Sequence, residues 1–223
     1  MRNEEKLIKG YLLNYFEEKG YYYFHQYENT YFRKDDGKLS YRLEIQSNSN
    51  GIGYIEHSIT YWQIEDILIE IGKPNFTSEK LLAYREFMRT LINRKIGSFA
   101  PFNTSKPAKS EIDCILYSEY VKSYMEIEGK TFNDHYSFLP NALSEMDNLE
   151  KEGKYWHQGD VELVNSFFTG LIISKLCNDV NFDKKIELVN SIYYPKEHNL
   201  QQVIPYYEKL KERLKTVEPI YNI

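Results

Sequence analysis

The chain has 223 residues, of which 42% are hydrophobic, so it can form one sizeable domain or two small ones with a packed core. Its formal net charge of −5 argues against nucleic acid as the main partner, because phosphate binding requires concentrated Lys and Arg side chains. No apolar run approaches the ~18–20 residues that a membrane span needs, and the N-terminal residues lack the apolar core of a signal peptide. We therefore expect no contact with a membrane.

The first predicted element is a helix from Asn3 to Lys19. Its apolar side chains recur at helical spacing and form one stripe, namely Leu7, Ile8, Tyr11, Leu12, Tyr15 and Phe16. Asn3 can cap the start of this helix, and Gly20 suits the position just past its end.

Four strands are predicted next, over residues 21–26, 30–34, 39–46 and 52–62. The third of them alternates between apolar and polar side chains, so one face is buried and the other face carries Arg42 and Glu44. Asp36 and Gly37 precede this strand and favour a tight type I′ hairpin. Because the links between the strands are short, the sequence predicts an antiparallel meander.

Two further helices are predicted, over residues 64–71 and 78–95. The outer side of the second helix carries three arginines, Arg85, Arg89 and Arg94. This local basic patch could contact an acidic partner or a phosphate. A cluster of this kind is also typical of a solvated helix face, and that alternative stays open.

The stretch from Gly97 to Ser110 is rich in turn-forming residues and is the predicted internal boundary. It separates residues 1–96, which hold the first helix, the sheet and two helices, from residues 111–223. We expect these two parts to pack as one unit.

The second half is predicted to be mainly helical. Residues 111–128 are the exception, because Ile112, Cys114 and Leu116 alternate along the chain and favour one or two short strands. The predicted helices cover residues 141–151, 160–176, 183–192 and 200–217. The predicted fold class is therefore α+β, with an antiparallel meander sheet packed by helices and a helical C-terminal half.

The two cysteines, Cys114 and Cys177, are isolated in the sequence and form no C-x-x-C pair. Two separate cysteines in a chain of this length favour reduced thiols, and we predict a cytoplasmic protein.

No catalytic or metal-binding motif stands out. None of the five histidines pairs with another at helical spacing, and no cysteine lies at ligand spacing. The phosphate-binding loops and the G-x-S-x-G motif are absent. His135 and His157 each lie near a carboxylate, but both stretches are typical of polar loops. We therefore predict no cofactor, no metal site and no catalytic residues, and we favour a protein that is not an enzyme.

One enzymatic alternative stays open. A helix followed by three meandering strands, with Asp36 at a hairpin and Glu44 on the next strand, resembles the core order of the restriction-endonuclease-like nucleases. That resemblance implies a metal site in which Asp36 and Glu44 supply the carboxylates. Gln46 stands where the family's motif usually has a lysine, and the hairpin turn by itself explains Asp36.

A second resemblance covers more of the chain. The helix that ends at Gly20 is followed by Tyr31-Phe32-Arg33, Leu43-Glu44-Ile45-Gln46-Ser47 and Ile59-Thr60-Tyr61, and then by a helical half. This pattern resembles small bacterial α+β proteins of unknown function, several of which are thought to be immunity partners of polymorphic toxins. It implies binding to a protein through a sheet face or a loop edge, and it carries over no functional residues.

We therefore predict a cytoplasmic protein-binding module of immunity type, whose partner is a protein such as a toxin. The candidate binding residues are Arg42 and Glu44 on the polar strand face, and Arg85, Arg89 and Arg94 on the basic helix face. The sequence does not predict the oligomeric state.

Overall fold

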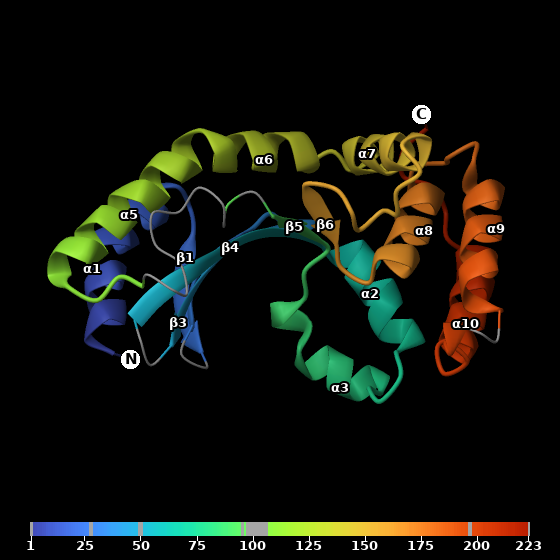
Figure 1. Cartoon of the computed structure of the whole chain (residues 1–223), viewed down its shortest axis with the longest axis horizontal. Helices are drawn as coiled ribbons and strands as arrows, with labels where there is room; N and C mark the ends of the chain where they lie inside the picture. Colours follow the sequence, from blue (N-terminus) through green and yellow to red (C-terminus); the bar gives the residue numbers. More distant parts are fainter. Residues whose placement is uncertain are drawn as a thin grey trace. The chain divides into compact units, whose positions relative to one another are not determined.

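The computed structural model of the chain describes residues 2–26, 29–48, 51–94, 96, 107–195 and 198–222. Most of the predicted boundary loop, at 97–110, lies outside these ranges, as do parts of the links before the second and fourth strands. Figure 1 traces the elements in chain order, from blue to red.

The described residues form the following elements: α1 (Asn3–Glu18), β1 (Tyr22–Gln26), β2 (Asn29–Asp35), β3 (Leu39–Asn48), β4 (Gly51–Tyr61), α2 (Trp62–Ile71), α3 (Ser78–Ala83), the 3-10 helix η1 (Arg85–Phe87), β5 (Leu91–Asn93), α5 (Glu111–Glu126), α6 (Glu128–Tyr136), α7 (Leu139–Lys151), β6 (Val161–Leu163), α8 (Ser166–Leu176), α9 (Phe182–Tyr193) and α10 (Ile204–Leu214). The strands form one sheet in the order β1-β2-β3-β4-β5-β6. The register is antiparallel in the β1–β2, β2–β3 and β4–β5 pairs. The predicted α+β class, with a meander sheet and a helical C-terminal half, is confirmed.

The chain divides into two compact units, and each unit is made of two separate stretches of sequence. Unit 1 comprises Met1–Ile59 and Leu91–Ser137, and unit 2 comprises Thr60–Thr90 and Phe138–Ile223. The chain therefore passes from one unit to the other three times, whereas the sequence suggested one boundary at residues 97–110.

The core of unit 1 forms where α1, α5 and the inner side of the sheet bury their apolar side chains. Phe16 of α1 stacks on Phe32 of β2, with ring centroids 4.2 Å apart. Residues fully shielded from water here include Ile8, Leu12, Leu43, Tyr117 and Val121. Gly20, with a φ of +80°, ends α1 as predicted, whereas the N-cap is Arg2 and not Asn3.

The turn between β2 and β3 is not the predicted type I′ turn, and Asp36 has another role in it. Gly37 has a φ of +87°, but Asp36 is not in the positive-φ region that a type I′ turn requires. Instead, the Asp36 carboxylate accepts hydrogen bonds from the backbone N–H groups of Lys38 and Leu39, at 3.1 and 2.7 Å. The side chain of Asp36 thus closes the turn.

The predicted strands over residues 111–128 are wrong, because this stretch is the helix α5. Its start is fixed by a capping box in which Ser110 and Asp113 bond to each other's backbone N–H groups. The buried residues Cys114, Tyr117 and Val121 follow helical spacing. The alternation that favoured a strand came partly from Ile112 and Leu116, which point outward.

The predicted helix over residues 78–95 is also wrong beyond Ala83, where α3 ends before η1 and β5. Side-chain hydrogen bonds hold this stretch against the start of α2. Thr90 Oγ1 accepts a bond from the Tyr61 backbone N–H at 2.9 Å and donates one to Glu65 at 2.6 Å. The backbone carbonyl of Met88 accepts a bond from Thr60. An extended backbone makes these bonds possible.

The predicted helix over residues 160–176 begins six residues later than expected, at Ser166. Val161 and Leu163 are buried in the short strand β6 instead. Asn165 then takes a left-handed conformation, with a φ of +54°, and turns the chain into α8. Asp160 is therefore not the N-cap that the sequence suggested.

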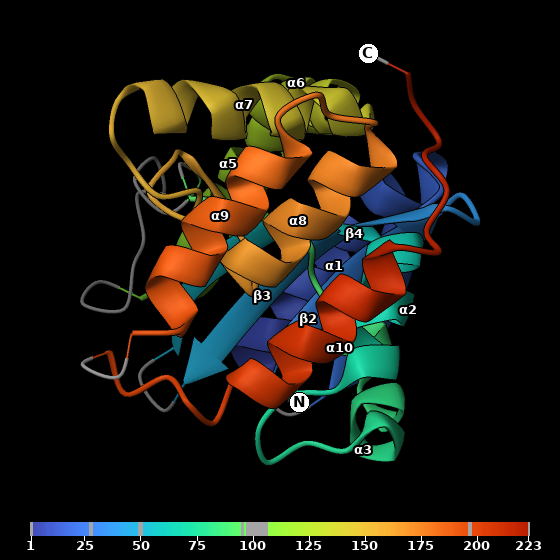
Figure 2. The same ribbon diagram turned by 90° about the vertical axis from the view of Figure 1, so that its right-hand side faces the viewer.

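The core of unit 2 is built around α8, which contacts α7, α9 and α10 (Figure 2). Its residues from Phe168 to Ser174 are all buried, so the prediction of a central apolar helix is confirmed for this part. Gly170 is needed where α8 meets Trp156, because a Cβ there would lie 2.2 Å from the indole ring. Among the described residues, no helix is both long and apolar enough to cross a membrane.

Candidate functional site

The predicted binding residues on β3 are buried in the structure. Arg42 is 2% exposed and Glu44 is 6% exposed. The guanidinium of Arg42 lies 3.9 Å from the carboxylates of both Glu44 and Glu56, and 5.8 Å from the centre of the Tyr31 ring. Arg42 therefore lies near one carboxylate of its own strand β3 and one of the neighbouring strand β4, and the structure does not present Arg42 or Glu44 on its surface.

The three predicted arginines do not share a helix face, because the helix that would have aligned them is broken. Arg85 bonds Asp66 through two nitrogens, at 2.8 and 3.1 Å, and lies over the Trp62 ring at 4.2 Å. Arg89 is half-buried in unit 2. Arg94 is exposed and belongs to unit 1. The predicted basic helix face is therefore wrong as a single surface.

The two carboxylates of the nuclease alternative have other roles in the structure. Asp36 closes its turn, as described above, and Glu44 accepts hydrogen bonds from Asn29 and Gln46, both at 2.9 Å. In the described part of the chain, no group of three or more His, Cys, Asp and Glu side chains is arranged to hold a metal ion.

A buried histidine in unit 1 is engaged in hydrogen bonding. The Nδ1 atom of His57 lies 2.8 Å from the hydroxyl of Tyr124, which also accepts a bond from Asn93 at 2.9 Å. Burial lowers the pKa of His57 to about 3, and a contact with Asn133 acts in the opposite direction without offsetting it. His57 is therefore neutral near pH 7 and shares a hydrogen bond with the hydroxyl of Tyr124.

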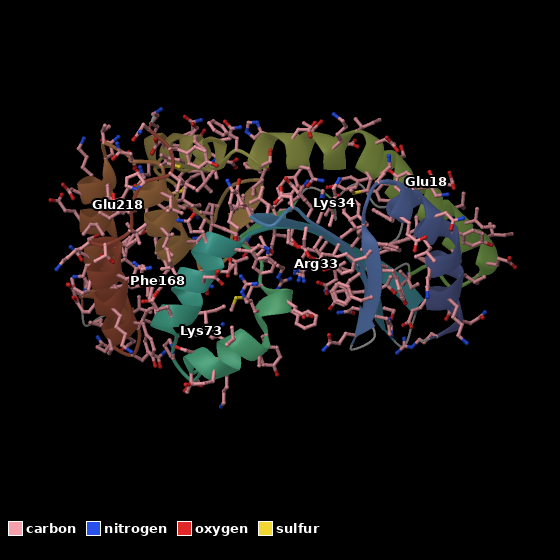
Figure 3. All side chains as sticks on the ribbon, turned by 180° about the vertical axis from the view of Figure 1, so that it is seen from behind. Glu18, Arg33, Lys34, Lys73, Phe168 and Glu218 are labelled. Atoms are coloured by element: carbon pink, nitrogen blue, oxygen red, sulfur yellow. The ribbon has the colours of Figure 1, made fainter. Side chains whose placement is uncertain are left out.

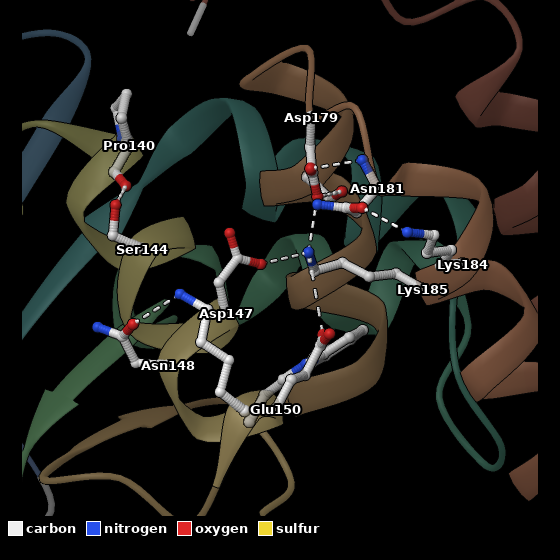
Figure 4. Close-up of polar contacts among 12 residues, drawn as sticks. Pro140, Ser144, Asp147, Asn148, Glu150, Asp179, Asn181, Lys184 and Lys185 are labelled. Atoms are coloured by element: carbon white, nitrogen blue, oxygen red, sulfur yellow. Dashed lines mark hydrogen bonds and ion pairs between the residues drawn. The ribbon is translucent and has the colours of Figure 1, made fainter. Parts of the chain in front are cut away.

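A buried lysine in unit 2 is the centre of a charge cluster (Figure 4). Lys185 is 1% exposed, and its ammonium group donates to Asp147 at 2.5 Å and to Asp179 at 2.7 Å. Glu150 lies 3.9 Å away and accepts a bond from the indole N–H of Trp156. Burial alone would lower the pKa of Lys185, but the bonds to Asp147 and Asp179 outweigh it, and the pKa is raised. The cluster joins α7 to α9 within unit 2.

Both cysteines are buried free thiols. Burial raises the pKa of Cys114 to about 11 and that of Cys177 to about 12. Neither thiol is ionised near neutral pH.

The outer face of α5 in unit 1 exposes three large aliphatic side chains, which we call the α5 surface. Ile112 is 69% exposed, Leu116 is 55% exposed and Ile115 lies on the same side. Ile115 and Leu116 lie three and four residues after Ile112, so both are neighbours of Ile112 on the next helical turn. Sequence reasoning missed this surface, although the capping pattern of Ser110 and Asp113 indicates the helix.

Unit 2 contains an open, mostly apolar cleft of about 740 Å³, which we call the unit 2 cleft. It lies among α2, the segment from Lys73 to Arg89, the start of α8, and the residues Tyr193 and Val203. Figure 3 labels Lys73 and Phe168, which belong to two of these walls. Sequence reasoning could not find this cleft, because its walls come from two stretches that are far apart in the chain.

Comparisons with family models, with curated proteins and with solved structures found no match to this chain.

Proposed function

We propose that this chain is a protein-binding module of immunity type, which holds a protein partner, such as a toxin, through the α5 surface. The observation that carries this proposal is the exposure of Ile112, Ile115 and Leu116 on one side of a helix whose other side is fully packed. Clustered exposed apolar side chains of this kind mark protein interaction sites, because their burial against a partner is favourable.

The charges beside the α5 surface indicate what the partner carries. Glu111 and Glu119 flank the three aliphatic side chains and are exposed, while Lys122 bonds Glu119 at 2.8 Å. Protein interfaces commonly have an apolar centre and a polar rim. We therefore expect a partner with an apolar patch that basic side chains surround.

The proposal places the chain in the cytoplasm. The two buried free thiols support this part of it, because disulfides are rare in that compartment. The α5 surface takes the place of Arg42 and Glu44 as the proposed contact, since those two side chains are buried.

The test is affinity purification of the tagged full-length chain from its native host, compared between the wild type and two variants. Leu116→Asp places a charge in the α5 surface. Val180→Asp places the same charge at an aliphatic residue that is 90% exposed in unit 2. We expect one protein, in equal molar amount, to be retained by the wild type and by Val180→Asp, and to be reduced at least tenfold with Leu116→Asp.

The captured protein is then expressed alone and together with each version of the chain. Growth arrest that the wild type and Val180→Asp relieve, and that Leu116→Asp does not relieve, supports the immunity type. A partner without toxicity contradicts the immunity type, and equal capture by Leu116→Asp contradicts the α5 surface. Circular dichroism of the purified variants shows whether the fold is intact.

A further inference from the structure

The unit 2 cleft has the size and lining of a ligand site. Its volume of about 740 Å³ lies within the roughly 300–1,000 Å³ that is usual for small-molecule sites. Its walls belong to unit 2 alone, so the cleft is complete within one compact unit. The cleft is separate from the proposed protein-binding site, because no residue of the α5 surface lines it.

The cleft is lined mainly by apolar and aromatic side chains. Leu68 and Leu81 are buried on the α2 and α3 side, and Phe168 and Tyr193 are buried on the opposite side. Phe76 lies at the opening and is 41% exposed. An aromatic ring left in water at the mouth of an apolar cleft favours an occupant that covers it.

Three charged residues line the cleft, namely Lys73, Arg89 and Glu65. Their formal net charge is +1, because there are two cations and one anion. Glu65 is buried and accepts a 2.6 Å hydrogen bond from Thr90, so its carboxylate belongs to the wall. Lys73 is exposed, and its ammonium group lies 4.8 Å from the centre of the Phe76 ring, at the opening.

The start of α8 adds to this positive character. Ser166 and Phe167, the first two residues of α8, line the cleft, and the side chain of the N-cap residue Asn165 makes no capping hydrogen bond. The first backbone N–H groups of a helix carry partial positive charge and favour an anion. The cleft therefore combines an apolar body with a positive side, in a chain whose net charge is −5.

We propose that the unit 2 cleft binds a small amphipathic molecule that has an apolar body and one carboxylate group. The body lies against Leu68, Phe168 and Tyr193 and covers Phe76. The carboxylate lies on the side of Lys73, Arg89 and the start of α8. A cationic molecule is disfavoured, because Lys73, Arg89 and the start of α8 give the cleft its positive side.

The test is calorimetric titration of the full-length chain with three ten-carbon probes, each below the concentration at which it forms micelles. The probes are decanoate, decanol and decyltrimethylammonium, which share an apolar tail and differ in charge. We expect decanoate to bind, decanol to bind at least tenfold more weakly, and decyltrimethylammonium not to bind.

Two pairs of matched variants locate the binding. Lys73→Glu reverses the charge at the opening of the cleft, and Lys80→Glu makes the same change at an exposed lysine of α3 outside it. Phe76→Ala removes the ring at the opening, and Leu82→Ala shortens an exposed side chain outside the cleft. We expect Lys73→Glu to weaken decanoate binding about tenfold and Phe76→Ala about threefold to tenfold, whereas Lys80→Glu and Leu82→Ala leave it unchanged.

Several outcomes would overturn the proposal. Tighter binding of decyltrimethylammonium than of decanoate would show that Glu65 determines the ligand. Equal binding of all three probes would show that charge does not determine binding. Binding of none of them would show that the cleft is not a site for such molecules. Equal weakening by Lys73→Glu and Lys80→Glu would place the effect outside the cleft. All four positions are exposed, so the variants keep the packed core.

Discussion

Two buried nitrogen bases, His57 in unit 1 and Lys185 in unit 2, are in opposite charge states. In unit 1, His57 has a pKa lowered to about 3 and is neutral. In unit 2, Lys185 has a raised pKa and is charged. Both side chains are almost fully shielded from water, and burial disfavours the charged form of each.

The difference lies in the neighbours of the two bases. Lys185 has two carboxylates, those of Asp147 and Asp179, within 2.7 Å. His57 contacts the hydroxyl of Tyr124, which carries no charge near pH 7. A buried base in this protein therefore keeps its proton only where the fold supplies carboxylates. Three measurements test this difference between His57 and Lys185.

The largest effect is expected from Lys185→Met, which keeps the apolar stem and removes the ammonium group. Asp179, whose side chain is 4% exposed, and Asp147 would then lose their shared cation. Removing one partner of a buried charge pair leaves an uncompensated charge, which costs about 3–5 kcal/mol in the free energy of unfolding. Urea unfolding of the full-length chain at pH 7 measures this loss.

The matched control for that experiment is Lys184→Met, which changes the neighbouring exposed lysine. Lys184 donates a single hydrogen bond, to Asn181 at 3.1 Å. We expect little change in stability. A similar loss in both variants would show that the cluster around Lys185 does not hold unit 2 together.

The second effect is a loss of stability in mild acid that depends on His57. The folded state holds the pKa of His57 at about 3, while the unfolded chain titrates near its ordinary value of ~6.5. Between pH ~6.5 and pH ~3 the side chain of His57 is protonated in the unfolded state and neutral in the folded state. The free energy of unfolding therefore falls as the pH falls through this range. At higher pH this contribution is constant.

Between pH 7 and pH 5 the wild type should therefore lose about 2 kcal/mol more than His57→Gln, which cannot titrate there. Urea unfolding at the two pH values measures the difference. The control is His135→Gln, which changes an exposed histidine of unit 1 and should leave the pH dependence of the wild type intact. An unchanged pH dependence in His57→Gln would mean that His57 can be protonated in place.

The third effect is expected from Tyr124→Phe. This change removes the hydroxyl that joins His57 to Asn93, and it leaves both side chains without that partner. Each of the two lost hydrogen bonds costs about 1 kcal/mol or less. The comparison variant is Tyr120→Phe, whose hydroxyl makes a longer bond of 3.3 Å to a backbone carbonyl. Equal losses of unfolding free energy in the two variants would show that the hydrogen bonds of Tyr124 to His57 and Asn93 contribute no more than an ordinary tyrosine hydroxyl.

The strands and the first helix could be predicted because local signals agreed with the tertiary structure. The predicted strand at residues 39–46 is β3, since its apolar and polar side chains alternate and Gly37 ends the preceding turn. The prediction of strands over residues 111–128 failed, because the two-residue period of a strand and the 3.6-residue period of a helix cannot be told apart in a short window. Ile112 and Leu116 were counted as inward, and both point outward.

The candidate sites could not be predicted, because they depend on contacts between distant parts of the chain. Lys185 and Asp147 are 38 residues apart, and His57 and Tyr124 are 67 residues apart. Arg42 and Glu44 have the polar pattern of a surface strand, but both are buried, with Arg42 near the carboxylates of Glu44 and Glu56. Periodicity identifies which residues share a face and does not show what covers that face.

The construction of unit 2 from two separated stretches has a consequence during synthesis on the ribosome. Thr60–Thr90 emerges early, and its helix α2 buries its apolar side against α8 and α10, which belong to Phe138–Ile223. Unit 1 has all of its residues once Ser137 has emerged, so it can close while α2 still lacks both partners. For the time needed to translate the remaining chain, the Ile64, Ile67, Leu68 and Ile71 side of α2 stays uncovered. We therefore expect α2 to be the segment of the nascent chain that a chaperone binds.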